Sequence, residues 1–131
     1  MAQNVDWILS KIVGAREFYE RFESWPSFHD AEIVELHLVR SGTSSLKVAI
    51  EKFTLDVDSS GDPITEKFAV ILRMVDIQEL FLNDFNHQNV IFELTLGPVE
   101  DGIEIGLHPT FGMYGRMVAR KVSLEYIALG I

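Results

Sequence analysis

The feature that most constrains the fold is a change of hydrophobic period at residues 25–33. Before it, apolar residues recur every three or four positions, which is typical of a helix; after it, they alternate in short segments. The links between these segments are too short for parallel crossovers, which need about a dozen residues or more, so neighbouring strands should pair antiparallel. We therefore expect an α+β fold with an N-terminal helix packed on a curved, mostly antiparallel sheet of about six strands, closed as a barrel or folded as a sandwich.

The helical pattern covers residues 4–23. Its apolar face consists of Val5, Ile8, Ile12, Ala15, Tyr19 and Phe22. Gly14 costs about 1 kcal/mol relative to alanine inside a helix, so the pattern fits either one helix or two shorter ones that meet near Gly14. Pro26 forces Trp25 out of the α region, which ends the helix near Ser24.

Alternating segments predict strands over residues 31–40, 46–57, 68–77, 90–96, 103–107 and 118–126. The segment 68–77 is apolar on both parities over its first half, so it should be a central strand. The segment 46–57 changes parity in the middle, and a one-residue bulge near Glu51 and Lys52 would keep its apolar residues on one face. The glycine-rich residues 109–115 are expected to be irregular.

Two carboxylates stand at the start of the first strand segment. Asp30 and Glu32 share the parity of its most consistently apolar residues, which are Val34, Leu36 and Leu38. A carboxylate on that face would lie at the rim of the core or be paired within it. We therefore expect Asp30 and Glu32 to receive hydrogen bonds that fix the corner between helix and strand.

The 131 residues fit a single domain, residues 1–131, and 47% of them are hydrophobic, which favours a folded chain. The chain contains no cysteine, which excludes disulfides, thiolate metal sites and a cysteine nucleophile and fits a cytoplasmic setting. The first residues lack the basic stretch and apolar core of a signal peptide, and no apolar run reaches the length of a membrane span, about 18 residues. We expect a cytoplasmic protein without a membrane partner.

Twenty acidic residues against eleven Lys and Arg give a formal charge of −9. No Lys or Arg occurs between Arg73 and Arg116, and the acidic block there contains Asp76, Glu79, Asp84, Glu93, Glu100, Asp101 and Glu104. Nucleic acid is disfavoured as a partner because phosphate binding needs clustered cations, whereas a basic protein would be attracted. The cations that follow the block are expected to pair with an acidic neighbouring strand. The alternative interpretation is that the charge only keeps the protein soluble.

The sequence contains no pattern typical of an enzyme. It lacks the G-x-S-x-G elbow, and the spacing of His29, Asp30 and Glu32 does not match the H-E-x-x-H metal motif. We expect no catalytic residue, no metal and no cofactor, although histidines on separate elements leave a metal-dependent enzyme as an alternative. The amide-rich residues 83–89 either satisfy their own backbone or present Asn86 and His87 to a ligand. A small-ligand or peptide-binding module built from these histidine, carboxylate and amide groups is the other alternative.

The segments 25–33 (WPSFHDAEI) and 85–91 (FNHQNVI) resemble the immunity protein 50 family, small bacterial proteins predicted to protect cells from polymorphic toxins. The resemblance implies an α+β fold and a non-catalytic protein that binds and neutralises a cognate toxin domain. The candidate binding residues within the two segments are Trp25, His29, Asp30, Glu32, Asn86 and His87. Because the chain is acidic, the expected partner is a basic toxin domain.

Overall fold

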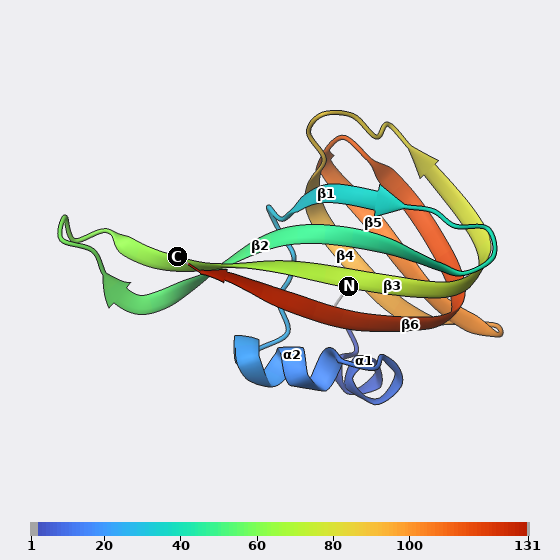
Figure 1. Cartoon of the computed structure of the whole chain (residues 1–131), viewed down its shortest axis with the longest axis horizontal. Helices are drawn as coiled ribbons and strands as arrows, with labels where there is room; N and C mark the ends of the chain where they lie inside the picture. The colour runs from blue at the N-terminus through green and yellow to red at the C-terminus, as the bar shows by residue number, and fades with distance from the viewer. Residues whose placement is uncertain (1–2, 131) are drawn as a thin grey trace.

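In the computed structural model, which describes residues 3–130, strands β1 to β6 form a closed barrel in the order β1-β2-β3-β6-β5-β4 (Figure 1). The elements are α1 (Val5–Lys11), α2 (Ala15–Phe22), β1 (Glu32–His37), β2 (Thr43–Val57), β3 (Pro63–Asn83), β4 (Val90–Val99), β5 (Gly102–Phe111) and β6 (Tyr114–Gly130). Neighbouring strands pair antiparallel. The mostly antiparallel sheet predicted from the alternation is confirmed, and it closes as a barrel rather than a sandwich. Every strand of a closed barrel has two neighbours, so β3 is not central in the strand order, but residues 68–72 are covered on both faces, as their apolar sequence predicts.

The sheet is larger than the alternation predicted. β3 and β6 extend well beyond the segments 68–77 and 118–126, and Val13 adds an isolated parallel bridge to Ser123. Residues 109–111, predicted to be irregular, belong to β5. The register shifts on both sides of Ile91 where β4 pairs with this part of β5, and such bulges let strands coil round a barrel without losing their partner.

The helical pattern of residues 4–23 forms α1 and α2, with a break at Gly14. Beside the break, the Leu124 N–H of β6 donates to the Val13 carbonyl at 2.7 Å. Gly14 has a φ of +91°, and a Cβ there would lie 1.8 Å from the Leu124 carbonyl oxygen, so the close approach to β6 requires glycine. α2 ends at Phe22, near the predicted stop. No helix in the described range is long and apolar enough to cross a membrane.

The buried core joins the helices to the barrel interior. α2 lies against β6, and α1 also approaches β4 (Figure 1). Phe18 of α2 is fully buried, and its ring centroid lies 5.4 Å from that of Tyr126 on β6 and 6.5 Å from that of Phe68 on β3. Phe22 lies 5.4 Å from the same Phe68 ring. Aromatic contacts of this kind hold α2 on the ends of β3 and β6.

β2 and β3 continue past the barrel as a two-stranded hairpin, drawn at the left of Figure 1. β1 pairs with β2 as far as Ala49, and the pairing of β6 with β3 ends at Lys67. Residues 51–66 therefore form what we call the projecting hairpin, in which each strand has its hairpin partner on one edge only.

The bulge predicted near Glu51 and Lys52 is wrong. The register between β2 and β3 runs without a shift through both residues to Phe53, and the irregularity lies between Phe53 and Val57. The side chain of Phe53 is 72% exposed, and Val57 is exposed as well. The change of parity in the sequence marks the point at which β2 leaves the core. It does not mark a bulge that keeps the apolar residues of the strand on the core face.

The prediction that Asp30 and Glu32 face the core is also wrong. The register of β1 against β2 shifts between Ile33 and Glu35, so a bulge reverses the parity within the segment. Ala31 and Ile33 are buried, whereas both carboxylates are exposed. The face with Asp30 and Glu32, which the sequence places in the interior, therefore lies at the surface, and the face with Ala31 and Ile33 is buried instead.

Candidate functional site

Residues 26–31 close the barrel and also create a cleft. The Asp30 N–H donates to the Ile91 carbonyl at 2.9 Å, and the Ile91 N–H donates to the Ala31 carbonyl at 2.8 Å, which fixes this segment to β4. Phe28 and Asp30 have φ values of 61° and 68°. A bulky residue such as Phe28 rarely adopts this left-handed backbone, whereas Asp adopts it more readily. The segment thereby turns away from β2 just where β1 begins, which leaves a space between the two.

We call this space the hairpin cleft. Its volume is about 620 Å³, within the range of ligand sites. Buried Phe22, Phe28, Ile50 and Phe68 line it together with the exposed apolar side chains of Phe53 and Leu129. The charged residues in the lining are Asp30, Glu32, Glu51 and Lys67. The lining thus combines an apolar floor with an excess of carboxylates.

The structure brings together three of the six candidate binding residues. His29, Asp30 and Glu32 line the hairpin cleft, whereas Asn86 and His87, both within the described range, do not. Trp25 is half-buried, with its ring centroid 5.9 Å from those of Phe18 and Phe28, so it packs on the core behind the segment. The ligand module that would use all the histidine, carboxylate and amide groups together is therefore not assembled in this cleft.

His29 makes only exposed contacts. Its Nδ1 lies 3.3 Å from the Asp30 carboxylate, and its ring meets Phe92 edge-on with the centroids 5.2 Å apart. The side chains of His29 and Asp30 keep 49% and 74% of their area exposed, respectively. Among the residues that the structure describes, no group of three or more His, Asp or Glu is placed to hold a metal ion. An exposed polar contact of this kind can accept hydrogen bonds from a partner's donor groups.

Asn89 bears out the interpretation that side chains of the amide-rich loop satisfy its own backbone. It is 3% exposed, its Oδ1 accepts from the N–H groups of Asn86 and Met113 at 3.1 and 3.0 Å, and its Nδ2 donates to the Asn86 carbonyl at 2.7 Å. A Cβ on Gly112 would lie 2.7 Å from this Oδ1. Asn89 thus connects the loop between β3 and β4 to the segment between β5 and β6. The sequence signal for this role is an amide side chain in a tight loop that precedes a strand.

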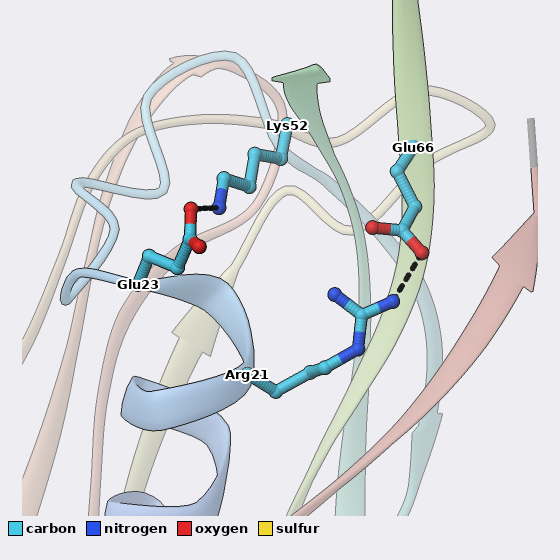
Figure 2. Close-up of polar contacts among 4 residues, drawn as sticks. All are labelled: Arg21, Glu23, Lys52 and Glu66. Atoms are coloured by element: carbon cyan, nitrogen blue, oxygen red, sulfur yellow. Dashed lines mark hydrogen bonds and ion pairs between the residues drawn. The ribbon is translucent and has the colours of Figure 1, made fainter. Parts of the chain in front are cut away.

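Two ion pairs hold the base of the projecting hairpin against the end of α2 (Figure 2). Lys52 Nζ lies 2.8 Å from the Glu23 carboxylate and 5.4 Å from the centroid of the Phe22 ring. Arg21 pairs with Glu66, the residue opposite Lys52 on β3. The hydrogen bond from Lys52, together with its charge, lowers the pKa of Glu23, and the hydrogen bond to Glu66 raises the pKa of Arg21. These exposed pairs orient the hairpin more than they stabilise it.

Acid should remove the contribution of the Glu23–Lys52 pair to stability. Since the pKa of Glu23 in the folded chain lies below its ordinary value of 4.5, the pair stabilises the fold above that value, and the stabilisation is lost as the pH falls through the lowered pKa. Lys52→Met keeps an apolar contact with Phe22 and removes the charge. The difference in unfolding free energy between the native chain and Lys52→Met, measured in urea from about pH 7 to about pH 3, should shrink towards zero.

The matched control for this prediction is Lys121→Met, which removes the same charge from an exposed lysine of β6. Its effect reports only the change in net charge. An identical pH dependence for the two variants would contradict a specific role for the Glu23–Lys52 pair.

The acidic block predicted from the sequence is partly neutralised. Asp76 lies 2.7 Å from the Arg120 guanidinium, and Glu79 and Glu104 both pair with Arg116. The ion pairs expected for the cations after the block are confirmed, but they reduce the negative potential that the block can project. The exposed carboxylates around the hairpin cleft and the projecting hairpin are Asp30, Glu32, Glu51, Asp56, Asp58 and Asp62.

The fold and site together define a small antiparallel β-barrel. Two helices precede the barrel in the chain, and an open, acidic cleft lies beside the projecting hairpin. The chain belongs to the immunity protein 50 family. The model of this family, described as Immunity protein 50, matches residues 14–130. The resemblance seen in segments 25–33 and 85–91 is thereby confirmed over nearly the whole chain. No curated protein and no solved structure matches it.

Proposed function

We propose that the chain is a non-catalytic bacterial immunity protein that acts in the cytoplasm as a single domain. It binds a cognate toxin domain and neutralises it by covering the toxin's active site. The observation that carries this proposal is membership of the immunity protein 50 family over residues 14–130. The open cleft beside the projecting hairpin supports it, because a protein that acts by binding needs an accessible surface with both apolar and charged groups.

The toxin contact is proposed for the hairpin cleft. Asp30 and Glu32 are exposed there and line the cleft together with Glu51 and Phe53, and His29 belongs to the same lining. Carboxylates in this position attract a basic toxin domain and set its orientation, and exposed apolar side chains supply the contact area. In this arrangement Trp25 supports the rim from the core, and Asn86 and His87 lie outside the contact.

The direct test is whether the chain protects cells from a toxin whose gene lies next to the gene for this chain. Cells that express the C-terminal domain of that toxin should stop growing, and co-expression of the chain should restore growth. The two purified proteins should elute together as a stoichiometric complex in gel filtration. Continued growth arrest together with separate elution would show that the chain is not the immunity protein for that toxin.

A further inference from the structure

One edge of β2 is free beyond Ala49. β1 occupies this edge between Ser45 and Ala49, and residues 26–31 then turn to β4. The opposite edge of β2 is paired with β3 as far as Val57. Along residues 50–53, where the register with β3 is unbroken, the backbone therefore has alternate N–H and C=O groups that point away from β3. Ile50, Glu51 and Phe53 also line the hairpin cleft. Beyond Phe53 the register shifts, and the Asp56 N–H donates to Thr54 Oγ1 at 3.1 Å.

Charge decides which strand can occupy this edge. Free edges attract other strands, and charged side chains block unwanted pairing. The edge carries exposed Glu51, with Asp56 further along β2, and its cation Lys52 is paired with Glu23. Asp30 and Glu32 line the same cleft. A second copy of the chain would bring the same carboxylates against these, so self-pairing is disfavoured, whereas a basic strand would be attracted. The cation in the cleft lining, Lys67, lies opposite Glu51 on β3, on the edge that is already paired.

We infer that the edge of β2 at residues 50–53 binds an extended, basic segment of the toxin as an added antiparallel or parallel strand. This inference rests on the proposed function and specifies its binding mode. Main-chain hydrogen bonds to the free edge supply affinity, and the two faces of the added strand supply specificity.

The two faces predict the pattern of the bound segment. Side chains on the face of Ile50 would enter the apolar lining that contains Phe22 and Phe68, which favours aliphatic or aromatic residues. Side chains on the other face would lie beside Glu51 and Phe53, which favours Lys or Arg through ion pairs and contact with the aromatic ring. The segment should therefore alternate apolar and basic residues over about four to six positions.

Two substitutions and a matched control test the location. Glu51→Lys should weaken binding of the neighbouring toxin domain about tenfold or more, because it reverses the charge that faces the basic segment. Phe53→Ala should weaken it about thirtyfold if the exposed ring is a central contact. Glu100→Lys makes the same charge change on the β4–β5 turn, outside the cleft lining, and should leave the dissociation constant unchanged in isothermal titration.

Amide hydrogen exchange tests the binding mode. Amides of β2 that bond to β3 are already protected, so an added strand should slow the exchange of alternate amides within residues 50–53, read by NMR. Slowing of none of them, or protection without alternation, would overturn strand addition.

The outcomes separate the two proposals. If the native chain binds the toxin and Glu51→Lys and Phe53→Ala bind equally well, the inferred site is wrong and the immunity function stands. If the native chain does not bind the toxin, the proposed function is wrong, and the inferred site, which rests on it, is wrong as well.

Discussion

Gly14→Ala should destabilise the protein by about 4 kcal/mol. The left-handed backbone costs a residue with a Cβ about 1–2 kcal/mol, and the new carbon would lie 1.8 Å from the Leu124 carbonyl oxygen, a backbone atom that cannot move aside. Relief of the clash requires Val13 to part from β6 and to lose the hydrogen bond from the Leu124 N–H. Since small domains are stable by about 5–15 kcal/mol, urea denaturation should show a large loss of stability.

Gly61→Ala is the matched control for this prediction. Gly61 also has a positive φ, +83°, but no atom lies within 4 Å of the position that its Cβ would take. Only the cost of a left-handed backbone for a residue with a Cβ remains, so the expected loss of stability is about 1–2 kcal/mol. Equal losses at the two positions would contradict the close packing of the α1–α2 connection on β6.

Asn89→Ala should destabilise the protein by about 3 kcal/mol. The substitution removes the hydrogen bonds that the buried side chain makes with the backbone of Asn86 and Met113. The Met113 N–H is buried, so water cannot easily replace the lost acceptor, and each unsatisfied buried group costs about 1–3 kcal/mol. The loss should appear in urea denaturation as a lower midpoint with an unchanged slope.

Asn86→Ala provides the comparison within the same loop. The Asn86 side chain donates to the Asp84 carbonyl at 2.9 Å and accepts from the Gln88 N–H at 3.0 Å, and both bonds are exposed. Water can satisfy these groups, so the expected loss is below about 1 kcal/mol. A larger effect at Asn86 than at Asn89 would show that the loop is held by other contacts.

Sequence alone predicted the elements that depend on local chemistry. The end of the helix before Pro26 and the hairpin of β4 and β5 follow from turn residues and from hydrophobic period. The break at Gly14 is one of the two alternatives that the sequence left open. The long-range ion pairs of the last strand also followed, because they need only complementary charges on neighbouring strands.

Features that depend on parity were not predictable to the same degree. A single bulge in β1 moved Asp30 and Glu32 from the expected interior face to the surface, because a shift of one residue exchanges the two faces of a strand. The left-handed Phe28 has no sequence signature, since bulky residues seldom adopt that conformation. The cleft that this turn creates therefore could not be derived from the sequence.

The candidate site was predicted in part. The segment 25–33 supplied His29, Asp30 and Glu32, which share the hairpin cleft, but Glu51 and Phe53 were overlooked as possible contacts. Their exposure follows from the length of β2 relative to its neighbours β1 and β6, which is a property of the whole barrel. The parity change at Glu51 was the visible signal, and we had interpreted it as a bulge.

The most direct test of the account is toxin binding by a chain with a shortened hairpin. Replacement of residues 53–65 by Asn-Gly would join Lys52 to Glu66, which are already paired, through a two-residue turn suited to a hairpin. The buried core residues resolved in the structure lie outside the replaced segment, and both ion pairs with α2 are kept. We predict an unfolding free energy within about 1 kcal/mol of the native value and binding of the neighbouring toxin weakened by about 100-fold or more, measured by isothermal titration. Native affinity in the shortened chain would contradict the claim that the projecting hairpin and its cleft form the toxin-binding surface.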